Sequence, residues 1–114
     1  MKYVLLIYDP SDRFARLQKA DFDRELAEYR AFGKEFAPAI QGGHALQAST
    51  EATTVRVRDG KTLTTDGPFA ETKEQLGGYY LIEAKDRDEA VTIAAKIPGA
   101  RFGSIEVRPV MTFS

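Results

Sequence analysis

The segment from Tyr3 to Tyr8 constrains the fold most, because it is apolar on both of its alternating faces. The two sets are Tyr3, Leu5 and Ile7 on one side, and Val4, Leu6 and Tyr8 on the other. A strand of this kind must be covered on both faces, which is typical of a central strand. The run is too short for a membrane-spanning helix and lacks the small-residue cleavage site of a signal peptide, so we expect a buried strand ended by Asp9-Pro10.

Two helices follow from apolar residues at helical spacing. The first has a stripe of Phe22, Leu26, Tyr29, Gly33 and Phe36, with Phe32 beside it. Asp21 is its expected N-cap and Pro38 ends it. The second begins at Asp86, which forms a capping box with Glu89, and ends at Pro98-Gly99. Its buried stripe is Ala90, Ile93, Ala94 and Ile97.

Three further segments have strand patterns. Residues 53–58 and 61–65 flank Asp59-Gly60, the commonest two-residue hairpin turn, and we expect this hairpin to be peripheral. Residues 79–84 form another central strand, and residues 103–110 form the last. Between the hairpin and residue 79 we expect a loop. The order of elements predicts one α+β domain over residues 1–114, a ferredoxin-like split βαβ fold with an antiparallel sheet and an inserted hairpin.

This topology leaves one sheet face bare, because both helices pack on the other. The first strand has apolar residues on both faces, and an exposed patch of that size would be unusual. Two sheets packed face to face would cover it, so we expect a homodimer. If Ile105 and Val107 face the helices, Glu106 and Arg108 must lie on the bare face. That arrangement predicts a polar cavity between the sheets.

Composition excludes several classes of function. The net charge of −1 gives no general attraction to nucleic acid or to anionic membranes, so neither is an expected partner. The absence of cysteine excludes disulfides and a cysteine nucleophile and agrees with a cytoplasmic location. One histidine and no clustered acidic motif give no metal site, and no phosphate-binding glycine loop is present. We therefore expect no cofactor.

The segment from Thr65 to Tyr80, TDGPFAETKEQLGGYY, closely resembles the DGPF branch of the YCII-related proteins. Further similarity lies in Met1-Lys2-Tyr3, residues 52–56, Asp88-Glu89-Ala90 and residues 103–110, so it spans nearly the whole chain. The resemblance implies a dimeric α/β-barrel. The wider YCII-related group is similar to the enzymes muconolactone isomerase and chloromuconolactone dehalogenase. The founding branch has a proposed His-Asp pair, but residues 21–30 of this chain contain no histidine where that branch has one.

Asp66, within the DGPF segment, is the expected acid–base residue. Its alternative role is structural, because Asp-Gly-Pro favours a turn and the carboxylate can accept local backbone hydrogen bonds. His44 could complete an acid–base pair if the strand after Gly42-Gly43 brings it close to Asp66, although a lone histidine after such a turn is more often a surface residue.

Substrate-binding candidates come from three regions. Arg108 is the best anion-binding residue, unless it simply pairs with Glu106 or Glu83. Glu71 and Lys73 lie in a segment that is either a solvated loop or a lid over a ligand. The tyrosines, chiefly Tyr8 and Tyr80, either pack within the sheet or present their hydroxyls to a ligand.

Three functional hypotheses remain open. The first is a cofactor-independent enzyme or binder of a small polar or anionic organic ligand, with Asp66 as acid–base group. The second is a non-catalytic regulatory protein associated with an extracytoplasmic-function sigma factor, because genes for similar proteins often neighbour those of such factors. In the third, residues 66–78 form a structural clamp across the dimer interface.

Overall fold

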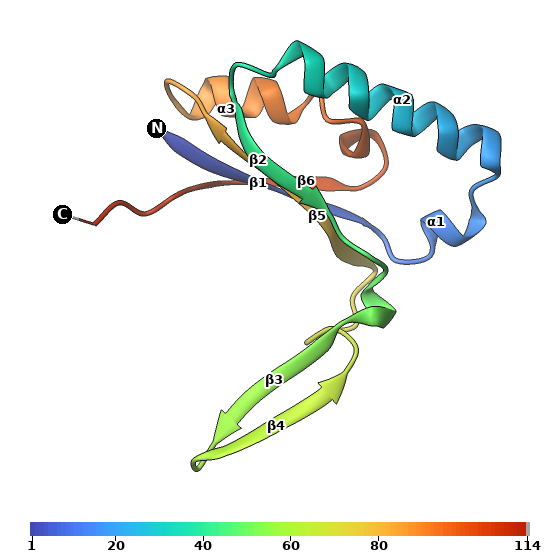
Figure 1. Ribbon diagram of the computed structural model, residues 1–114, viewed down its shortest axis with the longest axis vertical. Coiled ribbons are helices and arrows are strands. Elements are labelled where there is room, and N and C mark those ends of the chain that lie inside the picture. The colour runs from blue at the N-terminus through green and yellow to red at the C-terminus, as the bar shows by residue number, and fades with distance from the viewer. Residues whose placement is uncertain (114) are drawn as a thin grey trace.

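A four-stranded antiparallel sheet forms the centre of the protein, in a computed structural model that describes residues 1–113 (Figure 1). Its order is β2-β5-β1-β6, with β1 and β5 in the middle. The strands are β1 (Lys2–Pro10), β2 (Ile40–Ala45), β5 (Glu74–Glu83) and β6 (Ser104–Pro109). This is the strand order of a ferredoxin-like fold, so the predicted fold class is confirmed.

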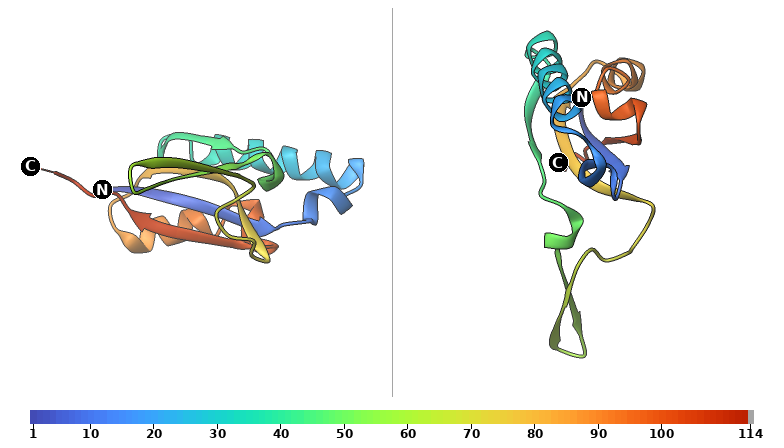
Figure 2. Two further views of the ribbon diagram at one scale, coloured as in Figure 1. Left: turned by 90° about the horizontal axis from the view of Figure 1, so that it is seen from below. Right: turned by 90° about the vertical axis from the view of Figure 1, so that its right-hand side faces the viewer.

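Helices cover one face of this sheet and leave the other open (Figures 1 and 2). They are α1 (Arg13–Arg16), α2 (Lys19–Glu35) and α3 (Arg87–Ala94), with short 3-10 turns η1 (Ser49–Glu51) and η2 (Pro98–Arg101). The predicted cap of α3 is confirmed, because the Asp86 carboxylate accepts a hydrogen bond from the Glu89 amide at 2.9 Å. By contrast α2 begins two residues before the predicted cap, after Gln18. None of the described helices has both the length and the apolar character needed to span a membrane.

The core lies between β1, β5 and the helices. Tyr3, Leu5 and Ile7 are buried against the helices, whereas Val4, Leu6 and Tyr8 on the alternate side are only partly covered. Across the sheet Tyr80 pairs with Leu5, and its ring lies 5.1 Å from that of Phe32 on α2. We use the name open face for the other side, formed by Val4, Leu6, Tyr8, Tyr79, Leu81, Glu106 and Arg108.

The strand β5 is longer than the sequence predicted. It begins at Glu74, within the segment expected to be a loop, because Gln75 and Glu74 continue the pairing with Asp9 and Pro10. A register shift after Ile7 leaves Gly77 without an opposite residue on β1, which makes a bulge. Gly77 and Gly78, which the sequence suggested as part of a loop, therefore lie inside a strand.

The hairpin of β3 (Thr53–Arg58) and β4 (Lys61–Asp66) forms a second sheet that extends away from the body (Figure 1). Its predicted turn is confirmed: Asp59 and Gly60 both have positive φ, 51° and 73°, as a type I′ turn requires. We call this hairpin the arm. It lies on the side of the sheet opposite the helices (Figure 2).

The burial pattern predicts where truncation destabilises the fold. Leu5 is fully buried and Leu63 on the arm is 49% exposed. We expect Leu5→Ala to lower the free energy of unfolding by about 3 kcal/mol, and Leu63→Ala by less than about 1 kcal/mol, in urea denaturation. Equal losses would contradict the assignment of the core.

Candidate active site

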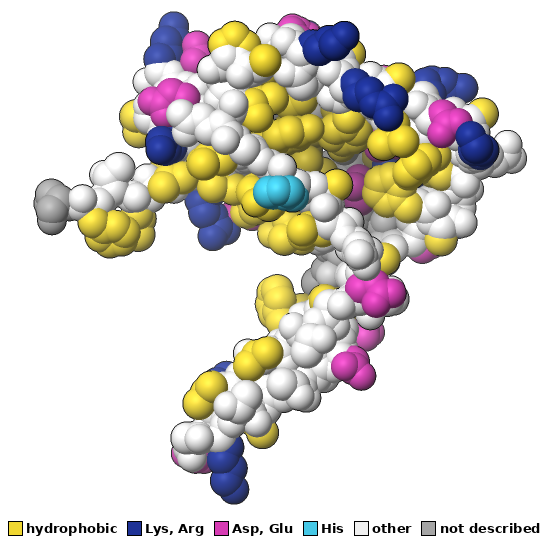
Figure 3. All heavy atoms as spheres, viewed as in Figure 1, with side chains coloured by type: hydrophobic (Ala, Val, Ile, Leu, Met, Phe, Trp, Pro, Cys, Tyr) yellow, Lys and Arg dark blue, Asp and Glu magenta, His cyan; other side chains and the backbone are white. Residues whose placement is uncertain are grey.

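A pocket of about 580 Å³ lies between the N-terminal half of α2 and the β2 edge of the sheet. That volume suits a small organic molecule. Its walls are mainly apolar, and hydrophobic side chains are visible in the hollow between α2 and β2 (Figure 3). The wall residues include Phe14, Phe22, Leu26, Leu46 and Tyr80. Phe22 and Leu26, predicted as part of the helix's buried stripe, are 41% and 39% exposed, and both line this pocket.

Asp9 brings a carboxylate into this apolar pocket. It continues the helix-facing alternation of Tyr3, Leu5 and Ile7, and it is only 7% exposed. Within residues 1–113 its Oδ1 atom is buried and has no hydrogen-bond partner. A buried polar atom without a partner costs folding free energy, so such a group is more often retained for function than for stability.

Two glycines, which have no side chains, leave space around the Asp9 carboxylate. A Cβ atom on Gly77, the bulge residue of β5, would lie 3.4 Å from Asp9 Oδ2. A Cβ atom on Gly99 in η2 would lie 3.7 Å from Oδ1 and 2.9 Å from the Tyr29 hydroxyl oxygen. A larger residue at Gly99 would therefore displace Tyr29, which also lines the pocket.

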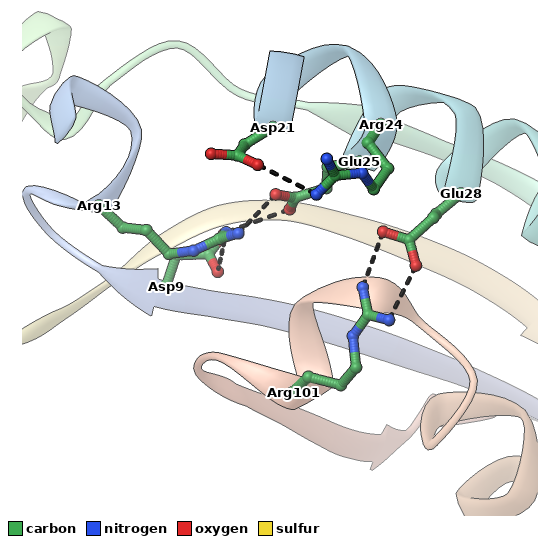
Figure 4. A network of polar contacts seen from close by, with 7 residues as sticks. All are labelled: Asp9, Arg13, Asp21, Arg24, Glu25, Glu28 and Arg101. Carbon is green, nitrogen blue, oxygen red and sulfur yellow. Dashed lines mark hydrogen bonds and ion pairs between the residues drawn. The ribbon is translucent and has the colours of Figure 1, made fainter. Parts of the chain in front are cut away.

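Arg13 and Glu25 form a nearly buried ion pair beside Asp9 (Figure 4). Two guanidinium nitrogens of Arg13 donate to the two carboxylate oxygens of Glu25, at 3.1 and 2.5 Å. The same guanidinium lies 3.7 Å from Asp9 Oδ1, beyond hydrogen-bond distance, and 3.7 Å from the centre of the Phe102 ring. The pair joins α1 to α2 and orients the arginine toward Asp9.

Electrostatics keep Asp9 easy to protonate. Burial raises its pKa, Arg13 lowers it, and the negative charges of Glu25 and Glu74 raise it again, with a net increase. The hydrogen bond to Glu25 raises the pKa of Arg13, which therefore stays charged. Burial also raises the pKa of Tyr29, and the nearby charges of Asp9 and Glu25 add to that increase. Of these groups Asp9 is the one suited to gain and lose a proton, because its pKa is raised above that of an ordinary carboxyl group while Arg13 stays charged.

The structure separates the residues that the sequence suggested. Tyr80 and His44 line the pocket. Tyr8 and Arg108 lie on the open face, where Arg108 pairs with Glu106 of its own strand. Asp66 ends β4 on the exposed arm, opposite Thr53, and Glu71 and Lys73 are exposed in the segment between the arm and β5.

His44 and Asp66 lie on different sheets. The His44 ring is paired with Tyr79, with 2.9 Å between Nδ1 and the tyrosine hydroxyl oxygen. For Asp66 no side-chain hydrogen bond or ion pair is formed within residues 1–113. An acid–base role for Asp66 stays a prediction, and it would act outside the pocket.

Sequence reasoning missed Asp9, Arg13 and Glu25. Asp9 was interpreted as the end of a strand because proline follows it, and Glu25 as a charge favourable to the start of a helix. One signal was present: Asp9 is the next residue in the alternation of Tyr3, Leu5 and Ile7, so it had to face the core if the strand continued.

Comparison with known proteins shows where this chain belongs. Its residues 1–114 match the YCII-related domain. The chain belongs to the YCII-related family. An uncharacterized protein, R00369, of Rhizobium meliloti strain 1021 is 36% identical over 117 residues, which cover 99% of this chain and 94% of that one. The family resemblance seen in the sequence is thus confirmed.

A solved structure has a similar fold. It is 5-chloro-2-hydroxyhydroquinone dehydrochlorinase (TftG) from Burkholderia phenoliruptrix AC1100, in complex with 2,5-dihydroxybenzoquinone. The TM-score is 0.53 with 17% identity, over 97% of this YCII-related chain and 94% of that one. At this identity the similarity supports the fold alone.

The buried ion pair predicts a large cost for neutralising Glu25. Glu25→Gln leaves the nearly buried Arg13 without its bidentate carboxylate partner, so we expect a loss of about 3 kcal/mol in the free energy of unfolding. Glu28→Gln is the control, because Glu28 pairs with Arg101 at the surface and its neutralisation should cost much less. Equal losses in urea denaturation would contradict the role of the buried pair.

Asp9→Asn should stabilise the protein at neutral and higher pH. The folded-state pKa of Asp9 is raised, so its ionised form opposes folding above that pKa, and the opposition disappears as pH falls through it. We therefore expect a higher Tm for Asp9→Asn at pH 8 and convergence with the wild type at acidic pH. The control is Asp12→Asn, at an exposed pair with Arg16. A lower Tm for Asp9→Asn at pH 8 would contradict this account.

Proposed function

We propose that this YCII-related protein binds a small organic molecule in the pocket between α2 and β2 and uses Asp9 as a cofactor-independent acid–base group. The observation that carries the proposal is the Oδ1 atom of Asp9, which has no hydrogen-bond partner within residues 1–113 and is buried at an apolar pocket large enough for a ligand. A ligand O–H or N–H group would supply the missing hydrogen bond.

The charges of the site favour a neutral ligand. Arg13 is already neutralised by Glu25, so the ionised Asp9 leaves the group with one net negative charge. An organic anion would be repelled by it, whereas a neutral donor would not. The aromatic and aliphatic walls suit a flat ring, such as a phenol, hydroquinone or quinone. The 2,5-dihydroxybenzoquinone bound by the dehydrochlorinase of similar fold supports the same class.

The chemistry that fits is proton transfer. The Asp9 carboxylate accepts a proton from the ligand, from oxygen or from an acidic carbon, and returns it at another position or to water. Arg13, 3.7 Å from Oδ1, stabilises the negative charge that Asp9 carries before it accepts the proton and again after it returns it. The raised pKa makes the Asp9 carboxylate a stronger base than an ordinary carboxylate, so it accepts the proton of a ligand more readily.

The protein is proposed to act as a homodimer in the cytoplasm. The partly covered apolar residues Val4, Leu6 and Leu81 on the open face support the dimer, because they remain accessible in a single chain. The regulatory hypothesis, with a sigma factor as partner, stays a prediction from the family resemblance.

The test combines binding with proton exchange. Thermal shift with neutral phenols, hydroquinones, quinones and lactones should raise the Tm of the wild type more than matched carboxylic acids do. For a ligand so found, deuterium uptake from D₂O into a carbon-bound position, followed by NMR, measures proton transfer directly. We expect Asp9→Asn to slow it by about 100-fold or more, and Asp66→Asn to leave it unchanged.

Two results would contradict the proposal. One is exchange that is equally fast in Asp9→Asn. The other is exchange lost in Asp66→Asn alone, which would return the acid–base role to the arm.

A further inference from the structure

The arm exposes apolar side chains that its own chain does not cover. Every residue of β3 and β4 is exposed except Thr54, and Val55 and Val57 are each 59% exposed. Phe69, just beyond the arm, is 81% exposed. An isolated two-stranded hairpin is marginally stable in water, so a hairpin of this form needs a surface to pack on.

The two faces of the arm differ in chemistry. In the observed register Val55 lies opposite Thr64, and Val57 opposite Thr62, which places these four side chains on one face. We call it the valine face. The other face contains Thr54, Arg56, Arg58, Lys61, Leu63 and Thr65. Asp66, opposite Thr53, lies on the valine face at the base of the arm, and the rest of that face is uncharged and suited to contact. The other face is mainly basic and suited to water.

Hydrogen bonds close the base of the arm and hold the sheet ends of its two connections. At its base Thr54 Oγ1 donates to the Gly67 carbonyl at 2.8 Å, and the Gly67 amide donates to the Ala52 carbonyl at 2.7 Å. Both connections are tied to the body, by Leu46 N to Gly77 O at 2.9 Å and by Ser11 N to Lys73 O at 3.0 Å. The two strands of the arm are therefore joined at its base as well as at its turn.

The valine face and the open face are two uncovered surfaces of one L-shaped molecule. The arm extends on the side of the sheet opposite the helices (Figure 2), and hydrophobic side chains lie along its left side in Figure 3. The molecule measures 48 × 47 × 19 Å, so the arm reaches far beyond the body in one direction.

We propose that the arm packs against a second copy of this chain, with its valine face in contact with the open face of that copy. A two-fold axis makes this contact twice, because each copy offers one arm and one open face. Both apolar surfaces of both copies are then covered, and the assembly closes as a dimer. The inference rests on the homodimer of the proposed function and adds the element that holds it together.

Two double variants test the role of the valine face. Val55→Thr/Val57→Thr keeps side-chain size and strand propensity but places hydroxyls in the contact, so the Kd of the dimer should rise roughly tenfold or more. Arg56→Thr/Arg58→Thr changes the opposite face of the same strand and should leave the Kd within about threefold of the wild type. Sedimentation equilibrium measures all three proteins.

A photo-cross-linking side chain, benzoylphenylalanine in place of Val57, identifies what the arm touches. In mixtures of ¹⁵N-labelled and unlabelled protein, we expect cross-links between copies that end near Leu6 or Leu81. Cross-links within one chain, or only between two arms, would overturn the proposal.

The outcomes separate this inference from the dimer on which it rests. A wild type that is monomeric at all concentrations overturns both. A dimeric wild type whose Kd is unchanged by Val55→Thr/Val57→Thr overturns the arm alone. Proton transfer by Asp9 is measured independently, by deuterium uptake.

Discussion

The nearly buried pair of Arg13 and Glu25 determines the shape and the charge of the candidate site. Arg13 begins the short helix α1, immediately after β1, and Glu25 lies on α2. Their two hydrogen bonds fix the connection between the first strand and the first long helix, and thereby close one end of the pocket. Because the Arg13 guanidinium donates its hydrogen bonds to Glu25, it forms only an ion pair with Asp9, at 3.7 Å, and no hydrogen bond.

This arrangement explains how one carboxylate is kept ready for proton transfer. A direct hydrogen bond from Arg13 would lower the pKa of Asp9 and fix it in its ionised form. Burial, together with the charges of Glu25 and Glu74, acts in the opposite direction and has the larger effect. The space that Gly77 and Gly99 leave around the carboxylate lets a ligand approach it. The ionised Asp9 carboxylate thus lowers the free energy of unfolding. The hydrophobic core and the pair of Arg13 and Glu25 offset this loss.

Much of the fold could be predicted from local patterns, but the site could not. The two apolar faces of β1, the cap of α3 at Asp86 and the Asp59-Gly60 turn are local signals that tertiary contacts did not override. The family was likewise identified from the segment around residues 65–80.

The site depends on contacts between distant residues. Arg13 and Glu25 are twelve positions apart, and Asp9 becomes buried only because β5 continues through Gly77 to Gln75 and Glu74. Nothing local distinguishes Asp9-Pro10 from a turn. The same turn chemistry favoured Asp66, which the structure places on the arm, outside the pocket.

The pKa of Asp9, measured by the pH dependence of its ¹³C carboxyl chemical shift, tests the account most directly. The account predicts a pKa in the wild type clearly above the ordinary value of 3.8, and a lower pKa in Glu25→Gln, where one negative charge is removed and Arg13 is released toward Asp9. A wild-type pKa at or below the ordinary value would show that Arg13 holds Asp9 ionised. It would contradict the proposal that this carboxylate exchanges protons with a ligand.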